Sequence, residues 1–157
     1  MLRGKCAIIT GASRGIGKAI ALLFADNGCD LIVGGTNGDL LEKLCEEIRG
    51  LGRRCFPLVG DVADPDTARR FVASAEEAYG RIHILVNNAG INDRTSTLAL
   101  SHSAWKRVLD INLSGTFYTG QAVLQHMVDH GGGVIVNMSS TAAKTAKANA
   151  AVSYGAS

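Results

Sequence analysis

A glycine-rich loop near the N-terminus has the residue types and spacing to bind phosphate groups. Residues 10–17 read TGASRGIG, which is a G-x-x-x-G-x-G pattern after a short apolar run. We expect Gly11 to permit a tight turn, Gly15 to let the backbone approach a pyrophosphate, and Gly17 to let the following helix lie close to a sheet. The N–H groups at the start of that helix would then face the phosphates. The loop therefore predicts a dinucleotide site rather than a simple strand-to-helix turn.

The end of the second predicted strand indicates which dinucleotide would bind. In sites that bind NAD, an acidic residue at this place contacts the 2′-hydroxyl of the adenosine ribose. Residues 34–37 of this chain read GGTN and contain no acid, and Arg14 lies in the glycine loop beside them. A 2′-phosphate would meet a guanidinium and small polar donors, without a repelling carboxylate. The pattern favours NADP over NAD; the alternative is that Arg14 is a solvated loop cation.

Short apolar runs that alternate with helical stripes must position this loop. The predicted strands are continuously apolar, which is typical of parallel strands covered on both faces. They span residues 5–10, 30–34, 54–59, 82–87 and 134–138. The predicted helices span residues 16–27, 40–50, 64–79 and 103–130. This order predicts an α/β protein with a doubly wound parallel sheet of Rossmann type.

Residue types at the helix starts and after the strands refine this arrangement. Asn37 or Asp39 should cap the second helix. Asp64, followed by Pro65, should cap the third. The two long loops, residues 92–103 and 139–153, both follow strand C-termini. Ligands bind at that edge of such sheets, so these loops are expected to complete the site.

The composition indicates a single globular domain and excludes several classes of protein. The chain has 157 residues, of which 46% are hydrophobic and 19% charged, and its net charge is +2. This balance argues against a disordered chain and against a protein that mainly binds nucleic acid. No apolar run is long enough for a membrane helix or a signal peptide, so we expect a cytoplasmic protein without a membrane partner.

Metal and thiol chemistry are not expected. The cysteines show no CxxC spacing: they are Cys6, Cys29, Cys45 and Cys55. We interpret them as small buried thiols rather than metal ligands or disulfide partners. His126 and His130 are four residues apart, but the sequence near them offers no third ligand for zinc.

Motifs along the whole chain resemble those of the short-chain dehydrogenase/reductase family. Residues 10–17 match the family's TGxxxGxG loop, and residues 87–90, NNAG, match a second motif. Four further matches follow in the family's order: Asp61-Val62 after the third strand, Asn112 in the long helix, Ser139-Ser140 after the fifth strand, and Tyr154 at the start of a Y-x-x-x-K motif. The strings TGASRGIG and NNAGI are similar to those of 3-oxoacyl-carrier-protein reductases.

The resemblance implies an oxidoreductase that interconverts a ketone and a secondary alcohol by hydride transfer with NADP, with 3-oxoacyl thioesters as one substrate class. In that role Tyr154 would supply the proton, Ser140 would hydrogen-bond the carbonyl oxygen, and Asn112 would hold a water that relays protons. The structural alternatives are a packing role for Tyr154, a turn cap for Ser140, and a helix bend at Asn112. A methyltransferase of similar topology is disfavoured because residues 34–37 lack the acid that such a site needs.

The resemblance also implies the cofactor contacts. They are Gly11, Ser13, Arg14, Gly15, Ile16 and Gly17 at the phosphates, Thr36 and Asn37 at the adenosine ribose, Asp61 and Val62 at the adenine, and Asn88, Ala89 and Gly90 along the cofactor. For Asn87 we prefer a structural role, in which its amide pins neighbouring strands.

The sequence departs from the family pattern at its end. The motif lysine would be the residue after Ser157, and the family's sixth and seventh strands and substrate lid would follow it. The resemblance therefore implies that residues 1–157 are the first part of a dinucleotide-binding domain, incomplete at the C-terminus, from a homo-oligomer such as a homotetramer. Which of Ser139, Ser140 and Thr141 faces the substrate stays open. A non-catalytic dinucleotide-binding module that lacks the lysine is the alternative function.

Overall fold

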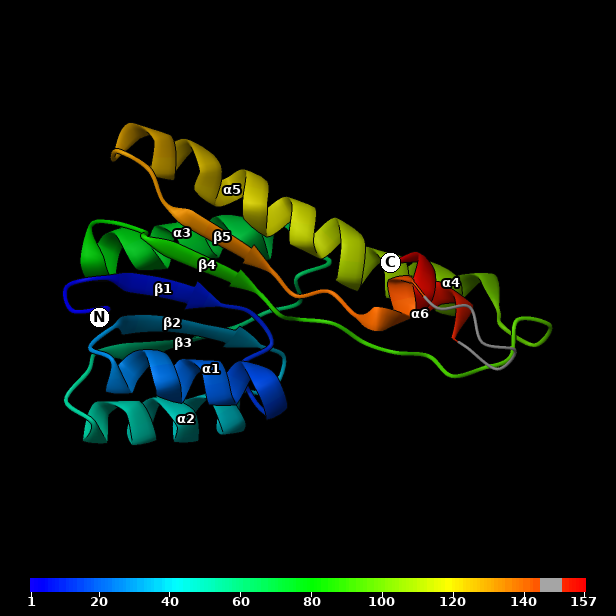
Figure 1. The fold of residues 1–157 in the computed structure, drawn as a ribbon, viewed down its shortest axis with the longest axis horizontal. Helices are drawn as coiled ribbons and strands as arrows, with labels where there is room; N and C mark the ends of the chain where they lie inside the picture. The colour runs from blue at the N-terminus through cyan, green and yellow to red at the C-terminus, as the bar shows by residue number, and fades with distance from the viewer. Residues whose placement is uncertain (145–150) are drawn as a thin grey trace.

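Five segments form one parallel sheet, in the order β3–β2–β1–β4–β5 (Figure 1). The computed structural model describes residues 1–144 and 151–157. The strands are β1 (Cys6–Ile9), β2 (Asp30–Gly35), β3 (Cys55–Val59), β4 (Ile84–Asn87) and β5 (Val134–Asn137). The chain crosses from β3 at one edge back to β4 beside β1. This order confirms the predicted doubly wound α/β fold, and it makes the C-terminal ends of β1 and β4 neighbours.

Helices cover both faces of the sheet because side chains alternate along each strand. Four of them pack on it: α1 (Gly15–Asp26), α2 (Gly38–Gly50), α3 (Pro65–Tyr79) and α5 (Gly115–Asp129). Ala7 and Ile9 of β1 belong to a buried cluster with residues of α1 and α2. Ile8, between them, belongs to a second cluster with residues of α3 and α5. The two pairs of helices lie on opposite sides of the sheet in Figure 1.

The helix starts follow the predicted caps. The Asn37 side chain accepts a hydrogen bond from the Leu40 N–H at 3.0 Å, so Asn37 rather than Asp39 caps α2. Asp64 accepts from the Asp66 N–H at 2.9 Å and caps α3, with Pro65 as its first residue. Both contacts satisfy N–H groups that the helix itself leaves unpaired.

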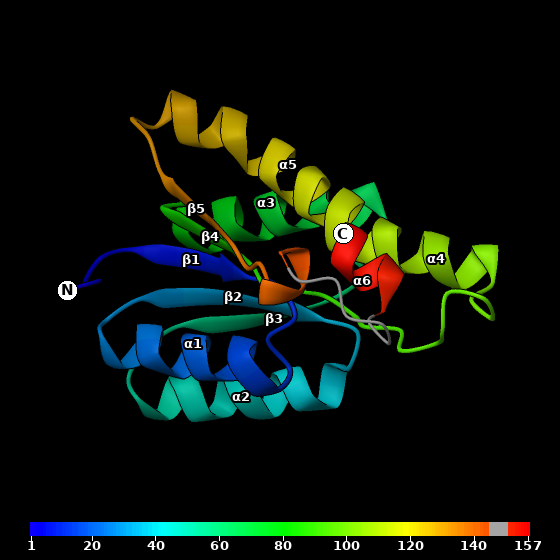
Figure 2. The same ribbon diagram turned by 45° about the vertical axis from the view of Figure 1, so that its right-hand side comes forward.

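The long helical stretch predicted over residues 103–130 is confirmed, with one unpredicted feature. It consists of α4 (His102–Leu109), a π-helical turn η1 (Asp110–Ser114) and α5, and Ser101 caps its start. A short helix, η2 (Thr141–Ala143), lies within the predicted loop 139–153, and α6 (Val152–Ala156) begins at its end. Residues 145–150 of that loop lie outside the described residues. Figure 2 shows α6 beside α4, beyond the C-terminal ends of the strands, and η2 contacts α6.

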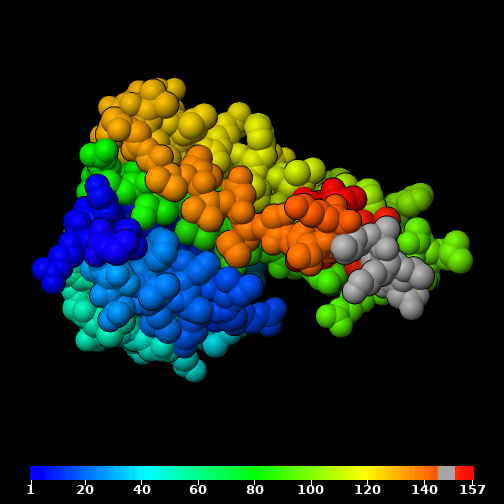
Figure 3. Space-filling model, viewed as in Figure 1, coloured from blue at the N-terminus to red at the C-terminus, as the bar shows by residue number. Residues whose placement is uncertain are grey.

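The edge strand β5 is apolar and exposed. Val134, Ile135 and Val136 are exposed to 57%, 37% and 40%, because in the described part of the chain β5 pairs with β4 alone. Orange atoms of the β5 region lie uncovered on the front of the space-filling view (Figure 3). An uncovered apolar strand edge can pair with another chain.

Residues 1–157 expressed alone are therefore expected to aggregate, and Ile135→Lys should raise the monodisperse fraction by placing a charge on this edge. Gel filtration with light scattering measures that fraction. Leu51→Lys adds the same charge at an exposed position after α2 and should have no such effect. A monodisperse parent chain would contradict the expectation.

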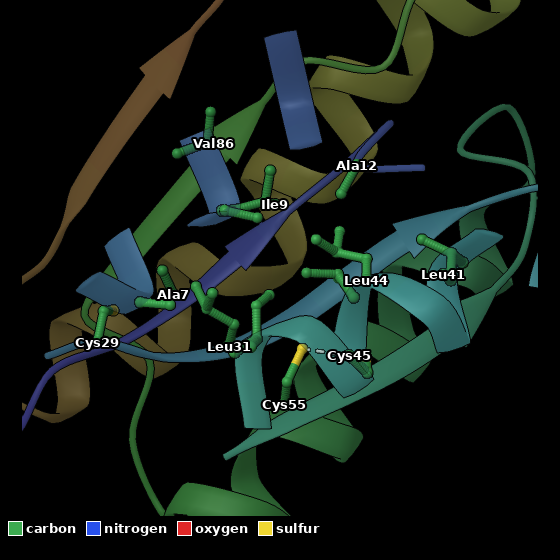
Figure 4. Packing of buried hydrophobic residues seen from close by; sticks show 14 residues of the cluster. Ala7, Ile9, Ala12, Cys29, Leu31, Leu41, Leu44, Cys45, Cys55 and Val86 are labelled. Carbon is green, nitrogen blue, oxygen red and sulfur yellow. Dashed lines mark hydrogen bonds between the residues drawn. The ribbon is translucent and has the colours of Figure 1, made fainter. Parts of the chain in front are cut away.

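The four cysteines are buried free thiols, as the sequence predicted. Burial raises the pKa of the Cys29 thiol to about 12, which leaves it protonated and unreactive near neutral pH. Cys45 of α2 and Cys55 of β3 contact each other within the first cluster, with their Sγ atoms 3.0 Å apart (Figure 4). Within residues 1–144 and 151–157, no helix combines the length and the apolar character that a membrane span requires.

His126 and His130 serve packing and hydrogen bonding. Their rings stack with centroids 4.0 Å apart. His126 Nε2 accepts a hydrogen bond from the Ile82 N–H, and its Nδ1 lies 2.7 Å from Glu76 Oε1. His126 thereby joins α5 to α3 and to the segment before β4. The described residues contain no cluster of three or more histidine, cysteine or acidic side chains that could hold a metal ion.

Candidate functional site

The glycine loop between β1 and α1 requires glycine for three different reasons. Gly11 and Gly15 have φ angles of +64° and +57°, which residues with a side chain rarely adopt. A Cβ on Gly11 would also lie 2.7 Å from Ala89 Cα. Gly17 has an ordinary φ, but its Cβ would lie 2.4 Å from the Gly11 carbonyl oxygen. The loop is thus folded back against the start of α1.

The segment after β4 holds this loop in place. The Asn88 side-chain amide donates to the carbonyl oxygens of Thr10 and Gly11, at 3.0 and 3.1 Å. The Thr10 hydroxyl oxygen accepts from the backbone N–H groups of Asn88 and Ala89, each at 3.0 Å. The NNAG segment therefore fixes the glycine loop at the C-terminal edge of the sheet.

A cavity of about 400 Å³ opens between the glycine loop and the ends of β2, β3 and β4. Most predicted cofactor residues line it: Gly11, Ser13, Arg14, Gly15, Ile16, Thr36, Asp61, Val62, Asn88, Ala89 and Gly90. Gly17 and Asn37 are not among its lining residues, because Gly17 is buried under the loop and the Asn37 side chain caps α2. The cavity also has lining residues that sequence reasoning missed: Gly35, Gly60, Ile91, Arg107 and Ile111.

A second cavity, of about 270 Å³, adjoins the first. The two share the wall formed by Ile16 and residues 88–91. Its other lining residues include Asn112, Ser140 and Tyr154, together with Asn92, Thr116, Met138, Ser139, Ala143 and Ser157. The structure therefore brings the three predicted catalytic residues to one cavity beside the predicted cofactor cavity, although they come from η1, the segment after β5, and α6.

Asn112 uses its side chain to organise the second cavity. Its Oδ1 accepts from the Ile91 N–H at 2.9 Å, and its Nδ2 donates to the Ile91 carbonyl oxygen at 3.0 Å. Nδ2 also donates to Ser157 Oγ at 2.9 Å, and Ser157 Oγ donates to the Tyr154 carbonyl oxygen. Asn112 thus connects the segment after β4 to the helix that carries Tyr154.

Ser140 combines a structural role with a place in the cavity. Its Oγ accepts from the Ala142 N–H at 3.2 Å and caps η2, which was the structural alternative. The hydroxyl proton is not used in that contact, so Ser140 can still donate to an oxygen in the cavity. Ser139 lines the same cavity.

Asn87 has the structural role that the sequence predicted. Its Nδ2 donates to Asn137 Oδ1 at 2.9 Å and to the Thr116 carbonyl oxygen at 3.3 Å, and its Oδ1 accepts from the Thr119 hydroxyl at 2.6 Å. Asn87 is 4% exposed, so these partners satisfy a buried amide. The residue ties β4 to β5 and to α5.

The charged residues of the larger cavity differ in their partners. Asp61 Oδ2 lies 2.5 Å from Arg107 Nη2, and Asp61 Oδ1 accepts from the Ala63 N–H at 3.0 Å. Arg14, at the start of α1, has no acidic partner in the part of the chain that the structure describes. Arg14 is therefore the cation of this cavity whose charge is not already neutralised.

Comparison with known proteins shows similarity along the whole chain. The sequence model of a family described as short chain dehydrogenase matches residues 5–157. The chain is 40% identical to a 3-oxoacyl-[acyl-carrier-protein] reductase of Thermotoga maritima, over 88% of this chain and 56% of the relative. It is 41% identical to an L-rhamnose 1-dehydrogenase (NAD(P)(+)) of Sphingomonas sp., over 91% of this chain and 57% of the relative. The chain spans little more than half the length of these relatives.

The chain is also similar to solved structures of short-chain dehydrogenases. A short-chain type dehydrogenase/reductase from Mycobacterium marinum superposes with a TM-score of 0.94 at 36% identity, covering 99% of this chain and 64% of that one. A 7α-hydroxysteroid dehydrogenase in complex with NADH and 7-oxo glycochenodeoxycholic acid also gives a TM-score of 0.94, at 35% identity, covering 99% and 60%.

Proposed function

The chain belongs to the short-chain dehydrogenase family, and from this premise we propose that the protein is an NADP-dependent oxidoreductase that interconverts a ketone and a secondary alcohol. The observation that carries the proposal is the pair of adjoining cavities. One contains the glycine loop, the other contains Asn112, Ser140 and Tyr154, and they share the wall of residues 88–91. That arrangement suits a hydride passing between a dinucleotide in one cavity and a carbonyl carbon in the other.

The larger cavity has the open backbone and the positive charge that the phosphate groups of a dinucleotide require. No atom lies within 4 Å of a Cβ built on Gly15, so the loop backbone there is open to a ligand. Helix α1 begins at this residue, and its first N–H groups carry partial positive charge. Arg14 adds a full positive charge beside them. Gly15 and Arg14 would therefore hold the phosphates, and Asp61 and Val62 would border the adenine.

The second cavity supplies the proton chemistry. When bound, the nicotinamide ring supplies or accepts the hydride. The Ser140 hydroxyl donates a hydrogen bond to the carbonyl oxygen and stabilises the charge that develops on it. The Tyr154 phenol gives its proton to that oxygen in reduction and takes it back in oxidation. Asn112 keeps the segment after β4 and α6 in place, because its amide is bonded to both Ile91 and Ser157.

A 3-oxoacyl thioester is the first substrate to test. The chain's TGASRGIG and NNAGI strings are similar to those of 3-oxoacyl-carrier-protein reductases, and one relative carries that name. The decisive measurement is oxidation of NADPH by the full-length protein with a short 3-oxoacyl thioester and a panel of simple ketones. If the protein binds NADPH but turns over none of these compounds, the non-catalytic binding module is the better description.

We further propose that the whole protein is a homo-oligomer. The helical stretch from η1 to α5 exposes Leu113, Phe117 and Leu124 to 53%, 59% and 54%. Large apolar side chains grouped on one helix favour contact with another protein surface. A second copy of the chain presents the same helix and would cover it.

Cofactor choice is testable at Thr36, which lines the larger cavity where the residues after β2 lack an acid. Thr36→Asp should weaken NADPH binding and reverse the preference to NADH, because the new carboxylate repels a 2′-phosphate and accepts a hydrogen bond from a 2′-hydroxyl. Titrations followed by nicotinamide fluorescence give both Kd values. Thr36→Asn is the uncharged control and should keep the preference for NADPH. Equal affinity of the parent protein for the two cofactors would contradict the NADP assignment.

A further inference from the structure

An ion pair at the wall of the larger cavity joins residues that are far apart in sequence. Arg107 lies in the last turn of α4, and Asp61 follows β3, 46 residues earlier. Their Nη2 and Oδ2 atoms are 2.5 Å apart, and both residues line the cavity that contains the glycine loop. The ion pair therefore forms part of the wall of the proposed dinucleotide cavity.

Asp61 is held by a contact on each of its carboxylate oxygens. Oδ2 accepts from the Arg107 guanidinium, and Oδ1 accepts from the Ala63 N–H at 3.0 Å. Each carboxylate oxygen can accept more than one hydrogen bond, so acceptor capacity is left for a donor in the cavity. The two contacts fix the side chain in one orientation. Asp61 is thus an oriented hydrogen-bond acceptor on the wall of the cavity.

Arg107 is poorly suited to bind a phosphate itself. Its charge is already matched by Asp61, and a phosphate beside this pair would meet the Asp61 carboxylate. Arg14 lines the same cavity and has no acidic partner among residues 1–144 and 151–157. Of the two arginines, Arg14 is therefore the one available to bind an anion. Beside Arg107, the Asp61 carboxylate is available to accept hydrogen bonds.

We propose that Arg107 is a positioning residue for base selectivity, which holds the Asp61 carboxylate where it accepts a hydrogen bond from the exocyclic amino group of adenine. The inference rests on the proposed dinucleotide function. It assigns to α4 a part in choosing the base, so that the site prefers a 6-amino purine over a 6-oxo purine. A 6-oxo group presents a lone pair to Asp61 instead of a proton and is repelled.

The test compares NADPH with its hypoxanthine analogue, which carries a 6-oxo group and the same fluorescent nicotinamide. Both Kd values are measured for the parent protein and for Arg107→Met, Arg107→Lys and Asp61→Asn. Arg107→Met is expected to weaken NADPH binding about tenfold, the size typical of losing one charge-assisted hydrogen bond, with little change for the analogue. Arg107→Lys should recover part of the selectivity, because an ammonium can still contact Oδ2.

Two controls separate positioning from a surface ion pair that only supports the fold. Arg69→Met removes a similar arginine–aspartate pair on exposed α3, outside the cavity, and should change neither Kd. Adding Arg107→Met to Asp61→Asn should cause no further loss of NADPH affinity, because both changes remove the same contact. A thermal melt of each variant shows whether it is folded.

The outcomes are distinct. A lower ratio of the two Kd values in folded Arg107→Met, with partial recovery in Arg107→Lys, supports the proposal. An unchanged ratio overturns it, even where the melting temperature falls, because the pair is then purely structural. If the parent protein binds neither dinucleotide, the proposed function fails and this inference fails with it.

Discussion

In the full-length protein, turnover is expected to fall by roughly 10²–10⁴-fold when Tyr154 is replaced by phenylalanine, the loss typical of removing a general acid. The change deletes one hydroxyl group and keeps the ring, so α6 should keep its packing and NADPH should bind with nearly unchanged affinity. Steady-state NADPH oxidation gives the turnover number, and fluorescence titration gives the Kd.

Tyr118→Phe is the matched control for this experiment. Tyr118 lies on α5 next to Phe117 and lines neither cavity. The same deletion of a hydroxyl there should leave the turnover number unchanged. If Tyr154→Phe retains more than about a tenth of the parent rate, Tyr154 is not the proton donor.

Gly17→Ala should abolish measurable NADPH binding and lower the free energy of unfolding by about 1–3 kcal/mol, the usual cost of overpacking. The added Cβ would lie 2.4 Å from the Gly11 carbonyl oxygen and 2.5 Å from Asn88 Nδ2. Relief requires the glycine loop to move away from α1 and from the Asn88 amide that holds it. The phosphate-binding backbone would then be displaced. Denaturant unfolding and cofactor titration measure the two effects.

Gly50→Ala provides the control, because it makes the same substitution in a helix without a clash. Gly50 is exposed at the end of α2, and no atom lies within 4 Å of its Cβ. Alanine is favoured over glycine in helices by up to about 1 kcal/mol, so this variant should be at least as stable as the parent. Gly17→Ala with parental cofactor affinity would show that the loop tolerates a side chain.

The sequence predicted the sheet and the conformation of the glycine loop because their determinants are local. Apolar runs define the buried strands, and Asp64 with Pro65 defines the start of α3. Glycine spacing predicts the loop because backbone conformation and close approach are properties of each glycine. Asn37 shows the limit of such reasoning. It was predicted both as a helix cap and as a ribose contact, and its side chain acts as the cap.

The parts that the sequence did not predict depend on long-range contacts. Arg107 reaches the cavity only because α4 lies near the segment after β3, and no motif links it to Asp61. The bond from Asn112 to Ser157 joins residues 45 positions apart. The π-helical turn gave no signal in the apolar stripe, which continues on both sides of it. The resemblance to the family identified the candidate catalytic side chains, but the fold had to bring them together.

The π-helical turn at Asp110–Ser114 also determines which side of the following helix, α5, faces the sheet. A π-helical turn holds one residue more than an α-helical turn, and each residue of an α-helix turns the chain by about 100°. If the same five residues formed regular α-helix instead, the extra residue would rotate α5 about its axis by roughly that angle. Val123 and Met127, now packed in the cluster beneath α5, would turn away from the sheet. The wide turn therefore lets the helix contain one additional residue while α5 keeps its apolar side against the sheet.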